Sequence, residues 1–99
     1  MEEAKLKELK ARYGELYEAE YGDKKFYFKK PTRQSFKRYY DKLLDSVYDA
    51  ACILCLDLVV EPSAEQFAQF IETDPGFPIK IVGRLTDFFG SATIQIKKI

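Results

Sequence analysis

A chain of 99 residues has room for one domain, and its 46% hydrophobic and 15% aromatic content argues against intrinsic disorder. Sixteen basic residues balance sixteen acidic ones, so the chain has no net charge and no long-range field that would select polyanions. It contains no histidine, which removes the imidazole used by serine and cysteine nucleophiles and by many zinc sites.

The first third of the chain changes from helical to strand-like spacing. Apolar residues recur every three or four positions from Leu6 to Tyr13, which predicts a short amphipathic helix over residues 2–13. The pattern then alternates every second residue on both sides of Gly22-Asp23, which predicts an antiparallel β-hairpin over residues 16–29. A two-stranded sheet is marginal alone, so we expect this hairpin to pack on helices.

Two helices are predicted in the middle of the chain. Thr32 follows Pro31 and can cap a helix over residues 32–45. The apolar stripe expected on the core side of this helix consists of Phe36, Tyr39, Tyr40, Leu43 and Leu44. Residues 47–60 are apolar nearly all round, which is typical of a central buried helix, although their β-branched end also suits extended backbone.

Two further helices are predicted before the C-terminal tail. Ser63 and Gln66 have the spacing of a capping box, which places a helix over residues 63–74. Pro78 suits the first position of a last helix over residues 78–89. Because Gly83 costs up to about 1 kcal/mol in a helix interior, we expect a close helix–helix approach there.

The tail, residues 91–99, alternates like a strand at Ile94 and Ile96, and it either joins the hairpin or stays loose. The predicted elements form a single domain over residues 1–99. Its fold class is α+β: a mostly helical domain with about five helices and one small antiparallel β-hairpin packed on them.

Little in the chain points to catalysis. Cys52 and Cys55 have the spacing of a redox motif, but they fall in mid-helix, where burial raises a thiol pKa, so we interpret them as core residues. No further soft ligand would complete a zinc site, and the acids show no spacing typical of acid–base work. We therefore predict no enzyme, no cofactor and no metal site. The charged N-terminus and the two cysteines favour a cytoplasmic protein.

Charge is segregated along the chain. Residues 24–42 carry eight bases and one acid, whereas residues 43–90 carry eight acids and two bases. Aromatic rings between the bases superficially fit single-strand nucleic-acid binding, in which bases stack on exposed rings. A short hairpin must bury one face, so its rings do not form such an exposed platform. Because the chain has no net charge, we expect the basic segment to pair with acidic residues of the same chain. Asp57 either pairs with Arg84 or points to solvent.

Two short motifs accompany this order of elements: a Lys-Pro-Thr-Arg step at residues 30–33 and a Pro-Gly-Phe-Pro turn at residues 75–78. With them, residues 9–90 resemble the tail assembly chaperones of siphophages and myophages and the related prophage proteins. The resemblance implies a non-enzymatic protein in the cytoplasm of a bacterial host. Such a protein keeps the long, helical tape measure protein soluble while the tail tube assembles.

A protein that holds a helical client needs an apolar surface with a charged rim. The candidate partner-binding residues are Arg33, Lys37, Arg38, Tyr39, Tyr40, Ile94 and Ile96. Of the two tyrosines, the one off the core stripe is expected to contact the partner, and the three bases form the rim. The alternatives are an unrelated structural or oligomerising interaction domain and, less favoured, a nucleic-acid-binding module that uses residues 24–42. No membrane partner is expected, and a homo-oligomer is possible.

Overall fold

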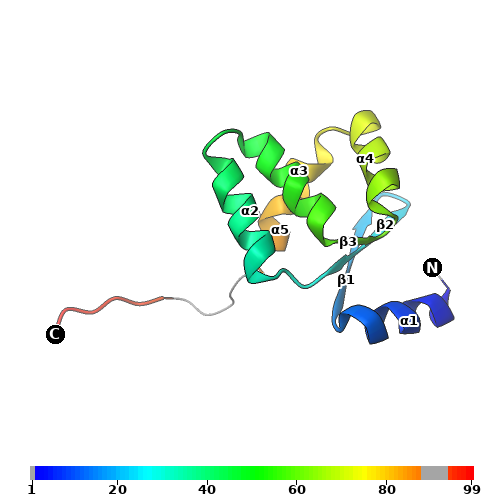
Figure 1. Ribbon diagram of the computed structural model, residues 1–99, viewed down its shortest axis with the longest axis horizontal. Helices are drawn as coiled ribbons and strands as arrows, with labels where there is room; N and C mark the ends of the chain where they lie inside the picture. Colours follow the sequence, from blue (N-terminus) through cyan, green and yellow to red (C-terminus); the bar gives the residue numbers. More distant parts are fainter. Residues whose placement is uncertain (1, 88–93) are drawn as a thin grey trace.

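The computed structural model describes residues 2–87 and 94–99 (Figure 1). In chain order its elements are α1 (Glu3–Tyr13), β1 (Leu16–Tyr21), β2 (Lys24–Lys29), α2 (Arg33–Leu43), α3 (Val47–Leu58), β3 (Val59–Glu61), α4 (Ala64–Thr73) and α5 (Phe77–Thr86). Within the described residues, five helices and one antiparallel sheet confirm the predicted α+β class. None of the described helices is long and apolar enough to cross a bilayer.

The predicted hairpin over residues 16–29 is confirmed as the antiparallel pair β1 and β2, and a third strand extends it to a sheet in the order β1-β2-β3. The helix predicted over residues 47–60 ends at Leu58, and the next three residues form β3, which pairs antiparallel with β2. Val59 lies opposite Phe28 in this ladder. β-Branched residues before Pro62 favour extended backbone, and the open edge of β2 supplies the hydrogen-bond partners.

The core lies between the sheet and the helices α3, α4 and α5. Phe26 and Phe28 of β2 are 2% and 1% exposed, and their rings contact Phe67 of α4 at centroid distances of 5.5 and 6.2 Å. Leu54 of α3 is completely buried in the same cluster. α1 lies apart from this core and is tied to the other side of the sheet through Lys5, whose Nζ is 2.8 Å from a carboxylate oxygen of Glu61 (Figure 1).

The predicted helix starts are confirmed where a polar side chain caps them. The backbone N–H of Ser35 donates to Thr32 Oγ1, and the N–H of Thr32 donates to Ser35 Oγ, which completes a capping box at α2. Ser63 and Gln66 make the same reciprocal pair at α4. These bonds satisfy backbone donors that the first helical turn leaves over.

The expectation of a close helix approach at Gly83 is wrong. Outside the backbone of its own helix, no atom of the described residues lies within 4 Å of the position that a Cβ would take there, and the residue is exposed. It sits on the outer side of α5, opposite the buried Ile81 and Leu85, so the lost helix propensity is not offset by packing at that point.

The described part of the tail, residues 94–99, has no regular secondary structure and extends away from the folded body (Figure 1). In the structure it does not join the sheet: Ile94 and Ile96 are 85% and 93% exposed. The last predicted helix corresponds to α5, whose described part ends at Thr86. The predicted helix residues 88–89 and tail residues 91–93 lie outside the described residues.

Candidate functional site

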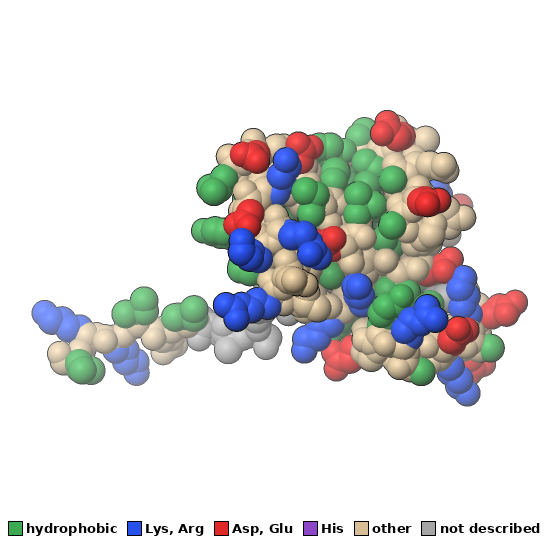
Figure 2. Space-filling view, viewed as in Figure 1, with side chains coloured by type: hydrophobic (Ala, Val, Ile, Leu, Met, Phe, Trp, Pro, Cys, Tyr) green, Lys and Arg blue, Asp and Glu red, His purple; other side chains and the backbone are tan. Residues whose placement is uncertain are grey.

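A row of apolar side chains covers the outer face of α2. Phe36 and Tyr40 lie on the helix, Leu44 directly follows it, and Val47 begins α3. Their exposed fractions are 40%, 58%, 85% and 63%. The Phe36 and Tyr40 rings stack, with centroids 5.9 Å apart and planes 29° from parallel. We call these four residues the α2 stripe; hydrophobic side chains project from this side of the molecule at the left edge of Figure 2.

The phase of α2 decides which of its side chains form the stripe. Ser35 is 2% exposed, and Tyr39, four residues later, packs partly buried against the core. Ser35 tolerates burial because its hydroxyl donates to the carbonyl of Thr32 at 2.9 Å. Tyr40 is rotated about 100° from Tyr39 and therefore points outward. Of the two tyrosines, Tyr40 is the one off the core.

Two of the three predicted rim residues lie beside the stripe. Arg33 lies three residues before Phe36 and Lys37 lies three residues before Tyr40, which places both along the same side of the helix. Lys37 Nζ is 2.6 Å from Asp41 Oδ2, an exposed pair. The stripe is therefore bordered by cationic side chains at its N-terminal end.

Arg38, the third predicted rim residue, turns toward α3 instead. Its Nε donates to Asp57 Oδ2 at 2.8 Å, and Asp57 is thus paired with α2 and not with Arg84. The side chain of Asp57 is 24% exposed. This ion pair joins α2 to α3 beside the stripe.

Ile94 and Ile96 are not part of this surface. Both remain on the tail, away from the folded body (Figure 1). Phe36, Leu44 and Val47 were expected on buried faces, and the structure exposes them. A helical projection of α2 separates a face with Ser35 and Tyr39 from a face with Phe36 and Tyr40. Hydrophobicity alone predicts that the face with Phe36 and Tyr40 is the buried one, so it could not identify this surface.

The basic segment is largely paired within the chain. Lys25 lies 3.8 Å from Glu18, Lys42 lies 3.8 Å from Asp45, and Lys24 lies 4.7 Å from the ring centre of Phe70. The aromatic residues at positions 26–28 are buried, so they do not form an exposed stacking platform. These contacts support the favoured interpretation of the segregated charge.

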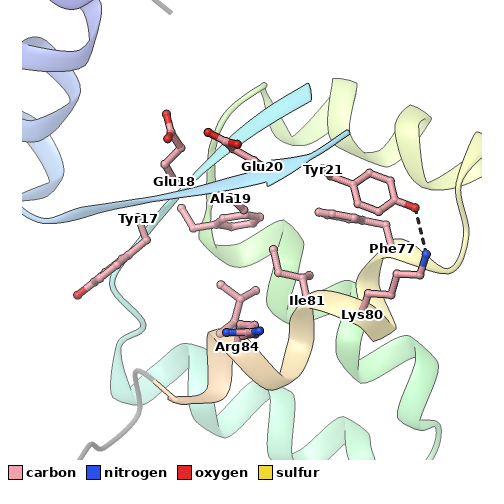
Figure 3. A pocket seen from close by; sticks show the side chains of 11 residues that line it. Tyr17, Glu18, Ala19, Glu20, Tyr21, Phe77, Lys80, Ile81 and Arg84 are labelled. Atoms are coloured by element: carbon pink, nitrogen blue, oxygen red, sulfur yellow. Dashed lines mark hydrogen bonds between the residues drawn. The ribbon is translucent and has the colours of Figure 1, made fainter. Parts of the chain in front are cut away.

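A separate feature is a groove of about 420 Å³ between β1 and α5 (Figure 3). Tyr17, Ala19 and Tyr21 of β1 face it, and Ile81, Lys80 and Arg84 of α5 line its other side. Lys80 Nζ donates to the Tyr21 hydroxyl at 3.2 Å, and this bond raises the pKa of Lys80. The groove therefore has apolar walls and two cationic side chains, Lys80 and Arg84, along its α5 side.

The two thiols lie where a core interpretation expects them. Cys55 is completely buried, and burial raises its pKa to about 12. Cys52 is partly buried, and desolvation also raises its pKa. Both thiols are therefore protonated at neutral pH, which removes the thiolate that nucleophilic chemistry requires. Among the described residues, no three histidine, cysteine, aspartate or glutamate side chains gather to hold a metal ion.

Comparison with known proteins places the chain in one family. The model of a domain of unknown function, DUF6848, matches residues 9–98. A solved structure of the uncharacterised protein rbstp2171 from Bacillus stearothermophilus is 27% identical, with a TM-score of 0.78 over 94% of this chain and 99% of that one. No curated protein matches the chain. Neither description names an activity, a ligand or a partner.

Proposed function

We propose that this chain, which belongs to the DUF6848 family, is a non-enzymatic protein-binding module that holds an amphipathic helix of a partner on the α2 stripe. The observation that carries the proposal is the row of Phe36, Tyr40 and Leu44, spaced every four residues and exposed by 40% to 85%. Scattered exposed apolar residues are ordinary, but a contiguous row on one helix face is typical of an interaction surface.

The spacing of the row defines the partner that fits it. Side chains four residues apart on a helix match the apolar anchors of a second helix laid alongside it. Arg33 and Lys37 at the N-terminal end favour acidic residues beside those anchors, since charge complementarity sets orientation and partner choice.

The stripe is suited to a partner that is later released. It lies on the convex outer side of α2, and its exposed side chains project from the surface instead of lining a deep pocket (Figure 2). Tight interfaces concentrate their energy in a few fully desolvated anchors, which this surface lacks. We expect weak, reversible binding made of several modest contacts.

The specific form of this proposal is a tail assembly chaperone in the cytoplasm of a bacterial host, whose client is the tape measure protein. The resemblance over residues 9–90 supports it, and so does the match between the stripe and a long helical client. A chaperone of this kind must cover apolar helix surface and then yield it to tube subunits, which weak and reversible contacts allow.

The test is co-expression of a tagged chain with a tape measure protein encoded beside it. The unchanged chain should raise the soluble fraction of the client and retain it during purification. Tyr40→Asp with Leu44→Asp should abolish both effects, because it places two charges in the stripe. Ile79→Asp is the matched control, since Ile79 is a 45% exposed apolar residue on α5.

The outcomes separate this function from its alternatives. A client whose solubility does not depend on the chain would rule out the chaperone role. Equal activity of the double stripe variant and the control would place the binding surface elsewhere. Nucleic-acid binding predicts instead an affinity for a labelled single strand that falls steeply with salt.

A further inference from the structure

The outer edge of β1 is open for a further strand. β1 is the first strand in the order β1-β2-β3, and no strand among the described residues pairs with its other edge. Such an edge offers backbone donors and acceptors to any extended segment that lies beside it. β1 is six residues long, which sets the length of the segment that would pair fully with it.

The two faces of β1 differ in chemistry. Tyr17, Ala19 and Tyr21 point toward α5 and line the groove, whereas Glu18 and Glu20 point away from it (Figure 3). An added strand continues this alternation, because successive side chains point to opposite faces of a sheet. A matching segment therefore carries apolar residues at every second position and positive charge at the positions between them.

The described tail has this pattern. Ile94 and Ile96 fall on one side of an extended strand, and Gln95 and Lys97 fall on the other. With Ile96 beside Ala19, the isoleucines continue the apolar wall of the groove. Lys97 then lies next to Glu18 or Glu20, depending on strand direction. Opposite charges on neighbouring strands stabilise a sheet.

We propose that residues 94–99 of one molecule add as a fourth strand to the β1 edge of a second copy, with Ile94 and Ile96 over the groove between β1 and α5. The tail stands off its own folded body, where both isoleucines are almost fully exposed (Figure 1). Reciprocal exchange of two tails closes a two-fold dimer and covers the β1 edge of each copy. One-way addition leaves the β1 edge of one copy uncovered. This self-association uses neither α2 nor its stripe.

The mass of the unchanged chain in solution is the first test. Sedimentation velocity up to about 1 mM should show a reversible rise toward the mass of two chains, since a six-residue strand makes a small interface. Ile96→Asp should remove this association. A chain that stays monomeric over the whole range overturns the proposal, and so does a dimer that survives Ile96→Asp.

A charge exchange tests the contact itself. Lys97→Glu and Glu20→Lys should each weaken association roughly threefold per contact, and roughly tenfold in a reciprocal dimer. Combining the two changes should restore it. Glu20 is chosen because Glu18 already accepts a hydrogen bond from Tyr27 at 2.6 Å. Because an antiparallel strand would place Lys97 beside Glu18, the exchange is repeated with Glu18→Lys, and failure of both combined variants to recover overturns the pairing.

Lys98→Glu is the matched control for charge. It makes the same change one residue later, on the groove side with Lys80 and Arg84, and should not weaken association. If Lys98→Glu and Lys97→Glu weakened association equally, Lys97 would have no specific contact with the glutamates of β1, and the proposed pairing would be overturned. Leu44→Asp should leave the dimer unchanged, so that a failure here and a failure of the proposed function are distinguishable.

Hydrogen exchange distinguishes the copy that supplies the tail. In a dimer, the Ile96 amide should become protected only as the protein concentration rises. Protection that is already present in dilute monomer would place the tail on its own β1 edge, and would overturn the proposed second copy.

Discussion

Arg38 Nε lies 2.8 Å from Asp57 Oδ2 and joins the middle of α2 to the last turn of α3. The two residues are 19 positions apart, so this bond is tertiary and not part of either helix. The bond accompanies a rotation of α2 in which Ser35 and Tyr39 face the core and Tyr40 faces outward. The exposure of the α2 stripe thus depends on how α2 docks.

A double-mutant cycle measures this bond. We expect a coupling of about 0.5–1 kcal/mol between Arg38→Ala and Asp57→Ala in the free energy of unfolding, the upper range for a partly exposed ion pair. Urea unfolding at low and high salt is the measurement. Lys37 and Asp41 form the control pair, and a coupling there as large as that of Arg38 and Asp57 would contradict the tie between the helices.

Substitution of a core phenylalanine and of a stripe phenylalanine should cost different amounts of stability. Phe67 is completely buried, so Phe67→Ala should cost about 3–5 kcal/mol and leave the chain unfolded or close to it. Phe36 is 40% exposed, and Phe36→Ala should cost under about 1 kcal/mol. Urea denaturation of both variants decides the point. Similar losses at the two sites would mean that Phe36 is a core residue.

The N-cap of α2 should contribute measurably to the free energy of unfolding. Thr32 accepts from the Ser35 N–H at 3.2 Å, and Thr32→Ala should lower the free energy of unfolding by about 1 kcal/mol. Thr32→Ser keeps the acceptor and should recover most of the loss. Thermal unfolding of the two variants is the measurement, and an equal loss in both would assign the effect to the threonine methyl group.

Burial of Cys55 predicts a pH dependence at high pH. Its folded pKa is raised to about 12, above the value of an exposed thiol, so the folded chain keeps this proton where the unfolded chain has lost it. The resulting stabilisation is complete below the unfolded pKa and is lost as pH rises through the folded one. The loss is at most about 1.4 kcal/mol per pH unit.

The measurement is urea unfolding between about pH 8 and 11. Cys55→Ala should show a shallower fall than the unchanged chain, whereas Cys52→Ala should retain most of the slope, since Cys52 is less buried. In the folded state at pH 8, a thiol reagent should modify Cys52 before Cys55. Rapid modification of both thiols would contradict the burial of Cys55.

Much of the element order follows from local chemistry. Thr32 and Ser63 mark helix starts because their hydroxyls satisfy backbone donors nearby, and Gly22 marks the hairpin turn because its φ of 64° suits glycine. These interactions span a few residues, so the amino-acid order alone determines them. The α+β class follows from the same signals.

Three features depended on contacts between distant residues. β3 formed because Val59 met the edge of β2; the β-branched residues there suit extended backbone, but they do not by themselves end the helix. Asp57 paired with Arg38, a choice made by the docking of α2 on α3. Docking also buried Ser35 and exposed Phe36, against the order of hydrophobicity. Local bonds determine where helices begin and end, but only packing between elements decides which face is left for a partner.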